Sequence, residues 1–407
     1  MKDEGKNTPD GDASRLAPHS FQYPLEGYAS RTIMIMAGGT GGHIFPALSV
    51  AEYLRAQGWQ VVWLGARGGM EAELVSPKGY TMAWIRFTGV RGRSFLSLLL
   101  LPLNLLIAFW QSARAIFLHR PHVVLGMGGY VAFPGGMMAS FLNRPLVIHE
   151  QNSVAGLANR VLALIADRIL VAFPRPFATD DGTRTETGAH PRARSFSSLI
   201  PHPSSFTVVG NPVRDEIAAL DRPEARFAAR SGRLQLLVIG GSLGAQVLNE
   251  TVPRALALLP EQARPRVTHQ SGAAHIAALR EHYARSGIAA ELVPFIDNMA
   301  AHYAAADLVV CRAGATTIAE LAAAGVASVL VPYPRAVDDH QTVNARYLVE
   351  RGAAVLLPQH EFTVEKLAGL LAEFTRDKLL AMARAARAAA KPEATRAVAE
   401  VCMELAA

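Results

Sequence analysis

The chain has 407 residues, of which 50% are hydrophobic and 18% are charged, and its formal net charge is +6. This length is too great for one ordinary core and predicts two domains, while the composition excludes a largely disordered chain. The two cysteines, Cys311 and Cys402, are too few for a disulfide framework and favour a reducing compartment.

The excess of positive charge lies in the first half. Residues 31–213 carry 16 Lys and Arg against 8 Asp and Glu, a balance of +8, whereas residues 214–407 carry 21 against 21. Such an excess favours an anionic partner, either nucleic acid or a membrane surface. The chain has no zinc-ligand spacing, aromatic RNA-binding motif or lysine-rich tract, so nothing supports nucleic acid as the partner.

Residues 1–30 are rich in Gly, Pro, Asp and Ser and contain no apolar stretch. They therefore predict a disordered tail rather than a secretory signal. From residue 31, short β-branched runs alternate with helical segments, which is typical of parallel α/β units. In this half the predicted strands are 32–36, 61–64, 123–125 and 146–149, with glycine turns at 37–43 and 126–130.

The pattern begins again at a strand predicted over 234–239, which enters a glycine turn. Later strands are predicted at 308–310, 329–331 and 354–357. Two such units predict an α/β protein with two Rossmann-like domains and a cleft between them, although periodicity alone does not exclude one large sheet. The predicted parts are a first domain at 31–213 with a C-terminal helix at about 391–407, a second domain at 214–390, a hinge at 210–214 and an inserted loop at 177–205.

A strand–glycine–helix turn directs backbone amides at an anion, so two such turns favour phosphate recognition. Tight turns with no ligand remain the alternative. Dinucleotide binding is disfavoured, because Ile44 stands where G-x-G-x-x-G needs its third glycine, and no ribose-binding acid follows at roughly 20 residues. The absence of a G-x-x-x-x-G-K-[ST] sequence excludes a P-loop NTPase.

Two polar clusters in the second half suit a nucleotide sugar. In 311–320 (CRAGATTIAE), Thr316 and Glu320 are four residues apart and share one helix face. Hydroxyls and free amides at a helix start suit a diphosphate, and a carboxylate one turn later suits a ribose diol. Gln341 and Asn344 begin another helix, and amides suit sugar hydroxyls. Ordinary polar helix starts remain the alternative for both clusters.

These segments together resemble the MurG family of GT-B transferases, the lipid I N-acetylglucosaminyltransferases of peptidoglycan synthesis. The resemblance runs from about residue 31 to the C-terminus. It departs in the tail, in the 177–205 insertion and at Leu243. The segments that carry it, in chain order, are MAGGTGGHIFP (36–46), FTGVRGR (87–93), VVLGMGGYVAFPGG (123–136), HEQNSVAGLANR (149–160), VVGNPVR (208–214), VIGGSLGAQVLN (238–249), FIDNMA (295–300) and CRAGATTIAELAAAG (311–325).

The resemblance implies inverting transfer of GlcNAc from UDP-GlcNAc to the MurNAc C4 hydroxyl of undecaprenyl-pyrophosphoryl-MurNAc-pentapeptide (lipid I), giving lipid II. It implies no tightly bound metal or other cofactor, and a peripheral location on the cytoplasmic face of the bacterial inner membrane. In the family pattern Ile296 meets uracil through its backbone and Glu320 meets ribose. The other residues implied at the donor site are Thr40, Gly41, Gly42, Asn152, Arg214, Ser242, Ala315, Thr316, Thr317, Ile318, Ala319 and Gln341.

Inverting transfer needs a base for the acceptor hydroxyl and stabilisation of the departing UDP. His43, which opens the helix after the first glycine turn, is the predicted base or positioning group, and Glu150 is the second candidate. A structural histidine that hydrogen-bonds the loop remains the alternative for His43. Tyr130 is predicted to help place the acceptor. The rival functions are a UDP-GlcNAc epimerase and a catalytically silent, membrane-peripheral nucleotide-sugar binding protein.

Residues 95–110 form the most apolar stretch of the chain. A bilayer span needs about 20 apolar residues. This run is shorter and contains Pro102 and Asn104, so a broken helix pair is predicted, partly packed on the core and partly exposed. With basic residues on both sides, residues about 87–114 are predicted to dock on an anionic membrane. A wholly buried core helix remains the alternative.

Overall fold

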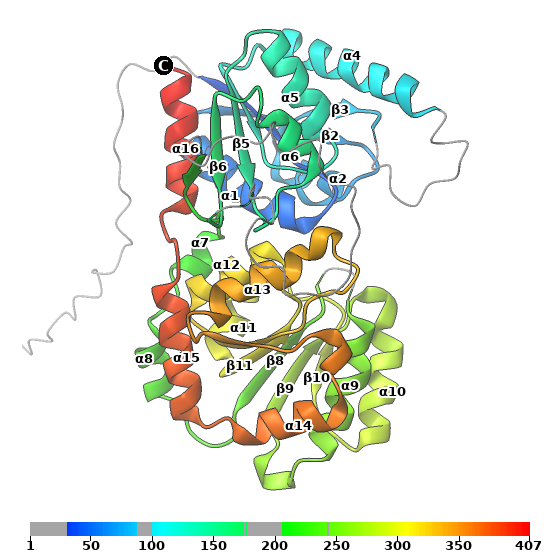
Figure 1. The fold of residues 1–407 in the computed structure, drawn as a ribbon, viewed down its shortest axis with the longest axis vertical. Coiled ribbons are helices and arrows are strands. Elements are labelled where there is room, and N and C mark those ends of the chain that lie inside the picture. Colours follow the sequence, from blue (N-terminus) through cyan, green and yellow to red (C-terminus); the bar gives the residue numbers. More distant parts are fainter. Residues whose placement is uncertain (1–30, 88–99, 175, 177–205, 242–243) are drawn as a thin grey trace, which may run out of the picture. The chain divides into compact units, whose positions relative to one another are not determined.

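The computed structural model describes residues 31–87, 100–174, 176, 206–241 and 244–407 (Figure 1). The predicted tail, the predicted insertion at 177–205, Ser242 and most of the FTGVRGR segment lie outside these ranges. Arg31–Ala407 forms a compact unit of its own.

The first sheet has seven parallel strands in the order β3-β2-β1-β4-β5-β6-β7. The strands are β1 (Thr32–Met36), β2 (Gln60–Ala66), β3 (Thr81–Ile85), β4 (Val123–Gly126), β5 (Leu146–Glu150), β6 (Arg168–Val171) and β7 (Phe206–Val208). The helices are α1 (Gly41–Ala56), α2 (Met70–Leu74), α4 (Leu101–His119), α5 (Ala132–Phe141) and α6 (Leu157–Leu162).

Alternation along β1 explains why this sheet is covered on both faces. Successive strand side chains point to opposite faces. Met34 and Met36 enter a core with residues of α4 and α5, whereas Ile33 and Ile35 enter a second core with residues of α1. Burial on both faces accounts for the continuous apolar run that predicted the strand.

The second sheet has six parallel strands in the order β10-β9-β8-β11-β12-β13. The strands are β8 (Gln235–Ile239), β9 (Arg266–Gln270), β10 (Glu291–Val293), β11 (Leu308–Cys311), β12 (Ala327–Leu330) and β13 (Ala354–Leu356). The helices of this half are α7 (Asp215–Ala218), α8 (Pro223–Ala228), α9 (Gln246–Ala257), α10 (Ile276–Ser286), α11 (Met299–Ala305), α12 (Ala315–Ala324), α13 (His340–Val349), α14 (Val364–Glu373) and α15 (Arg376–Ala388).

Both sheets have the doubly wound strand order, in which the first strand pairs with the second on one side and the fourth on the other. In such sheets ligands bind at the carboxyl ends of the strands where the order reverses. In the first sheet the reversal lies between β1 and β4, and in the second between β8 and β11. Glycine turns follow β1, β4 and β8, so three of these four strand ends carry one.

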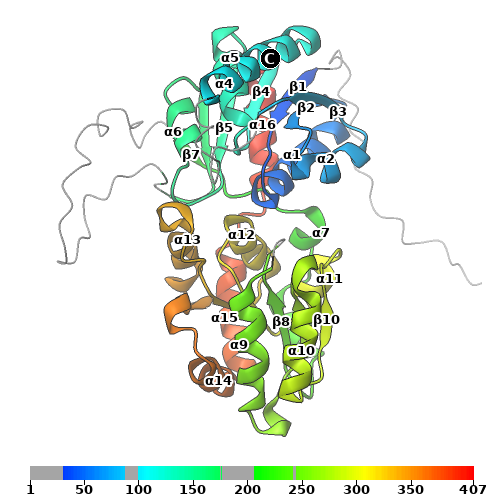
Figure 2. The ribbon, with the colours of Figure 1, turned by 90° about the vertical axis from the view of Figure 1, so that its right-hand side faces the viewer.

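The C-terminal helix α16 (Ala394–Leu405) returns to the first half, where it packs on α1, β4 and β5 (Figures 1 and 2). The connection that leads to it passes Gly210, where a Cβ would lie 2.4 Å from the Cβ of Lys391. Gly210 has a φ of +91°, which glycine adopts without strain. We keep the predicted domain limits, 31–213 with 391–407 and 214–390, as a proposal.

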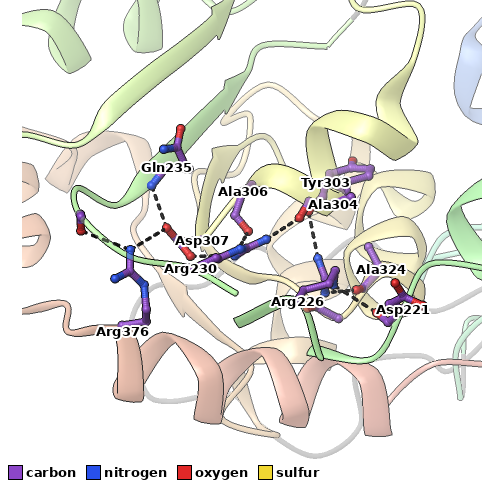
Figure 3. Close-up of polar contacts among 12 residues, drawn as sticks. Asp221, Arg226, Arg230, Gln235, Tyr303, Ala304, Ala306, Asp307, Ala324 and Arg376 are labelled. Carbon is purple, nitrogen blue, oxygen red and sulfur yellow. Dashed lines mark hydrogen bonds and ion pairs between the residues drawn. The ribbon is translucent and has the colours of Figure 1, made fainter. Parts of the chain in front are cut away.

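A buried polar cluster closes the amino ends of the second sheet's central strands (Figure 3). Asp307, fully buried, pairs with Arg230 at 2.6 Å and accepts from the backbone amide of Gln235 at 2.8 Å. Arg226 donates to the carbonyls of Tyr303 and Ala324. Burial lowers the pKa of Arg226 to about 10. This cluster holds β8, β11 and α11 together at the end of the sheet opposite the glycine turn.

Candidate active site

The first glycine turn is organised by a buried glutamate that sequence analysis did not single out. Glu71, on α2, accepts from the backbone amides of Ala66 at 2.8 Å and Gly39 at 3.3 Å. Gly39 has a φ of +90°. Thr40 is the N-cap of α1, and its side chain makes no capping hydrogen bond. The uncapped start of α1 therefore faces the carboxyl end of β1.

His43 lies in the first turn of α1 and contacts the loop after β5. Its Nδ1 is 3.1 Å from Oε1 of Gln151, and Nε2 of Gln151 donates to the carbonyl of Met127 at 2.7 Å. Tyr130 lies near the same turn, because a Cβ on Gly39 would be 3.1 Å from its ring. Burial raises the pKa of Tyr130, and the nearby Glu71 adds to this.

Glu150 is placed differently from its predicted role as a second candidate base. Its carboxylate is buried and accepts four hydrogen bonds, two from Asn152, one from the amide of Gly156 and one from Asn159. Four donors occupy the acceptor positions that a carboxylate offers. Glu150 therefore stabilises the 151–156 loop and the start of α6, and this geometry argues against a proton-transfer role.

Hydrogen bonds join the strand ends of the two sheets. Thr316 Oγ1, on α12, donates to the carbonyl of Gly42 at 3.1 Å. Oδ1 of Asn344, on α13, accepts from the amide of Ser153 at 2.8 Å, and its Nδ2 lies 3.4 Å from Oδ1 of Asn152. Asn344 is fully buried. Asn152 and Asn344, both predicted site residues, thus lie together. The side chain of Asn344 is hydrogen-bonded to other residues of the protein.

Helix α12 begins without a side-chain cap, because its N-cap residue is Gly314. One turn further, the buried carboxylate of Glu320 accepts from Arg214 at 2.8 Å and from the Tyr303 hydroxyl at 3.2 Å. Burial raises the pKa of Glu320, and the charge of Arg214 opposes that shift. The predicted residues Arg214, Thr316 and Glu320 are therefore brought together along one helix.

Other predicted residues occupy positions of several kinds. The side chains of Ala315 and Ile318 are buried in the core, so only their backbone is available to a ligand. Ala319 lines a small cavity that Gly210 and Asn211 also line, and Thr317 lies near Gly314 in the first turn. Gln341 accepts from the amide of Tyr333 at 2.9 Å. Ile296 packs its side chain in the same core as Ile318.

The comparisons with known proteins decide the family. The model of the glycosyltransferase family 28 N-terminal domain matches residues 33–171, and that of the family 28 C-terminal domain matches residues 235–400. The chain belongs to glycosyltransferase family 28. Its two sheets are the two Rossmann-like domains of the GT-B fold, and it is a glycosyltransferase.

Curated relatives match nearly the whole chain. A protein of Nitrosospira multiformis is 57% identical over 93% of this chain and 99% of its own length, and one of Aromatoleum aromaticum is 58% identical over 93% and 98%. Both are named UDP-N-acetylglucosamine–N-acetylmuramyl-(pentapeptide) pyrophosphoryl-undecaprenol N-acetylglucosamine transferase. The crystal structure of Acinetobacter baumannii MurG is 37% identical, with a TM-score of 0.75 over 92% of this chain and 99% of that one.

The predicted resemblance to the MurG family is thereby confirmed. A UDP-GlcNAc 2-epimerase from Neisseria meningitidis also matches, with a TM-score of 0.58 over 92% of this chain, but at 10% identity this likeness shows the fold alone. The epimerase thus has the same architecture as this chain, and the alternative function as an epimerase gains no further support.

Within this family 28 chain, a buried amide organises the glycine turn after β8, and sequence analysis missed it. Gln270, at the end of β9, accepts from the amide of Gly240 at 3.2 Å and donates to the carbonyls of Gly241 at 3.0 Å and Pro294 at 3.2 Å. Gln270 thereby ties the glycine turn to the segment that holds Ile296. Neither Gln270 nor Glu71 belongs to a recognisable motif, whereas Gln151 stands inside the HEQN segment already quoted.

Proposed function

We propose that this chain transfers GlcNAc from UDP-GlcNAc to the MurNAc C4 hydroxyl of lipid I, with inversion, to give lipid II. The names of the curated relatives support this activity. The observation that carries it in the structure is the hydrogen bond from Thr316 to Gly42, at 3.1 Å. It joins the uncapped start of α12, suited to a diphosphate, to the first turn of α1, which carries His43.

The donor nucleotide is proposed to lie along the start of α12. Free amides of a helix N-terminus bind phosphate, and the helix dipole favours its negative charge. The hydroxyls of Thr316 and Thr317 and the guanidinium of Arg214 are proposed to add donors, and Glu320 is proposed to bind the ribose hydroxyls. Backbone groups near Ile296 take the uracil. Ser242, also assigned to this site, lies outside the described residues.

The acceptor side is proposed to lie at the start of α1. Thr40, Gly41 and Gly42 face the donor sugar, and Tyr130 helps to place the acceptor. His43 acts as the base, taking the proton of the C4 hydroxyl as its oxygen bonds to the anomeric carbon. The anomeric carbon–UDP bond breaks in the same displacement, and the negative charge that forms on UDP is stabilised by the start of α12 and by Arg214.

Membrane docking is proposed to occur through α4, on the cytoplasmic face of the bacterial inner membrane. This helix has 19 residues and a mean hydropathy of 1.3, enough by length and composition to cross a membrane. One of its faces nevertheless packs on the protein, with Ala108, Ser112 and Ile116 buried. Its other face is open, and the exposed fractions of Leu103, Leu106 and Trp110 are 56%, 64% and 66%. This amphipathic arrangement favours a peripheral helix.

The predicted break at Pro102 is not found in the described part of this stretch. Pro102 occupies the first turn of α4, where a missing amide hydrogen costs no helical bond, and the helix continues through Asn104 to His119. Residues 88–99 lie outside the described ranges. The expectation of a partly packed and partly exposed segment holds for 101–119, and a wholly buried core helix is excluded there.

A transfer assay tests the proposed activity directly. Purified protein is given UDP-GlcNAc with a lipid I analogue, and the products are separated by mass. We expect UDP and a disaccharide-bearing lipid in equal amounts, with UDP formed only when the acceptor is present. Conversion of UDP-GlcNAc without acceptor would indicate an epimerase. Binding of UDP-GlcNAc without turnover would indicate the silent binding protein.

A further inference from the structure

The strongest unassigned feature is the buried amide that contacts the proposed base. Three segments converge on it, namely α1, which carries His43, the turn after β4, which carries Met127, and the loop after β5, which carries Gln151. These strands are neighbours in the order β1-β4-β5, so their carboxyl ends meet at the site. Gln151 is 1% exposed, so its amide group hydrogen-bonds to protein groups rather than to solvent.

The direction of each hydrogen bond follows from donor and acceptor chemistry. The Met127 carbonyl oxygen can only accept, so the group of Gln151 that lies 2.7 Å from it is the amide nitrogen. The amide oxygen of Gln151 then faces Nδ1 of His43 at 3.1 Å. An oxygen acceptor at that distance requires a proton on Nδ1. A neutral imidazole with Nδ1 protonated carries its lone pair on Nε2.

The surroundings of His43 favour this pairing over others. Gly128, with a φ of +87°, leaves space for the His43 ring, because a Cβ at this position would lie 2.6 Å from Nδ1 of His43. The neighbouring His149 is fully buried, and burial lowers its pKa to about 4, so it is neutral. Its Nε2 lies 2.9 Å from the carbonyl of Gly210. Among the described ranges, no carboxylate hydrogen-bonds to the His43 ring.

We propose that Gln151 is a positioning residue that holds His43 in the Nδ1-protonated tautomer, so that Nε2 is the atom that receives the acceptor's proton. This inference rests on the proposed function. As the C4 oxygen bonds to the anomeric carbon, the hydroxyl proton moves to Nε2 and the electron pair of the broken bond leaves with UDP. The Nδ1–H bond to Gln151 is present before and after that step, so the amide needs no rearrangement.

The tautomer itself is measurable by 15N NMR of the full-length protein labelled at histidine. The His43 signals are assigned by their loss in His43→Gln. At a pH where the ring is neutral, we expect a protonated, pyrrole-like Nδ1 and an unprotonated, pyridine-like Nε2. A proton on Nε2 in the wild type would overturn the proposal, whatever the role of His43 in catalysis.

Kinetics of Gln151→Met give the second measurement. Loss of one neutral hydrogen bond should lower kcat on the order of tenfold and leave the KM for UDP-GlcNAc nearly unchanged. The 15N signals of His43 should shift toward the Nε2-protonated form. An unchanged tautomer together with an unchanged kcat would overturn the proposal. By contrast, wild-type turnover in His43→Gln would reject the proposed base and leave the NMR result standing.

Gln151→Glu provides a further test should the methionine variant fail to fold. A carboxylate beside Nδ1 favours the charged imidazolium, so the acidic limb of the kcat/KM profile should move to higher pH. An acidic limb at the wild-type position in a folded Gln151→Glu protein would contradict the contact between these two side chains.

Discussion

Arg214 and Glu320 form an ion pair with 2.8 Å between Nη2 and Oε1, at the place where the ribose of the donor is proposed to bind. The Tyr303 hydroxyl contacts the other carboxylate oxygen at 3.2 Å. Glu320 is therefore held in position before any ligand arrives. Ribose hydroxyls must share or replace these donors, because the carboxylate is buried.

Glu320→Ala should lower the affinity for UDP by about 1–3 kcal/mol, because the ribose hydroxyls and the neighbouring donors lose their acceptor. Isothermal titration calorimetry measures this. Comparison with 2′,3′-dideoxy-UDP isolates the ribose contact, since the wild type should discriminate between the two ligands and the variant should not. Equal discrimination by both proteins, with the variant folded, would remove Glu320 from the ribose site.

His43→Gln and Glu150→Gln should separate catalysis from folding. Removal of a general base lowers the rate by roughly 10²–10⁴-fold, so His43→Gln should lose kcat and retain its affinity for UDP. Glu150→Gln places an amide donor against the four donors that surround this side chain. It should instead lower the thermal midpoint, with a loss of about 1–3 kcal/mol in the free energy of unfolding. A wild-type midpoint with a hundredfold lower kcat in Glu150→Gln would instead favour Glu150, the second candidate, as the base.

Much of the fold follows from the sequence because the central strands are buried on both faces. β1, β4, β8 and β11 are apolar runs, and they were predicted as such. The strands that were missed, β3, β6, β7, β9 and β10, lie toward the sheet edges. β9, for example, has the polar sequence RVTHQ. The glycine turns and α12 were predictable for a related reason, since local geometry restricts which residues they admit.

The side chains that surround and hold the site residues could not be predicted in the same way. Glu71 reaches the first glycine turn from a different segment, and no local pattern indicates this. Glu150 is the last residue of β5 and stands beside polar residues, so the sequence suggested a catalytic role for it. Only the folded chain shows that Asn159 and Gly156 occupy its oxygens.

Buried histidines should make the stability depend on pH. His269 is fully buried between Tyr283 and Asn249, and burial lowers its pKa to about 3. In the unfolded chain the His269 imidazole binds a proton near pH 6.5, whereas in the folded chain it does so only near pH 3. The stabilising contribution is therefore complete above about pH 6.5 and is lost as the pH falls toward 3, by up to about 1.4 kcal/mol per pH unit.

His269→Gln tests that linkage. The variant should be less stable at pH 7.5, because it alters a buried hydrogen-bonded site, but its thermal midpoint should fall less than that of the wild type between pH 7.5 and pH 5.0. His275→Gln is the matched control, since it removes a histidine whose side chain is not buried. Parallel decreases in all three proteins would contradict the role given to His269.

Docking on the membrane through α4 should be lost when its open face is charged. Leu103→Glu with Trp110→Glu replaces two side chains of α4 that are 56% and 66% exposed. Each apolar side chain inserted at the lipid boundary contributes roughly 1.5–3 kcal/mol. Cosedimentation with anionic vesicles at low salt should therefore fall at least about tenfold, while the affinity for UDP stays at the wild-type value.

Leu258→Glu is the control for exposure and for the sign of the added charge, one glutamate against two, because Leu258 is 58% exposed at the end of α9, in the half of the chain without excess positive charge. This variant should sediment with vesicles as the wild type does. Binding of the wild type should also weaken as salt is raised, since each basic residue near an anionic surface contributes about 1 kcal/mol that ions screen. Equal partitioning of all three proteins would refute docking through α4, because it would show that the exposed leucines and tryptophan of that helix do not meet the lipid.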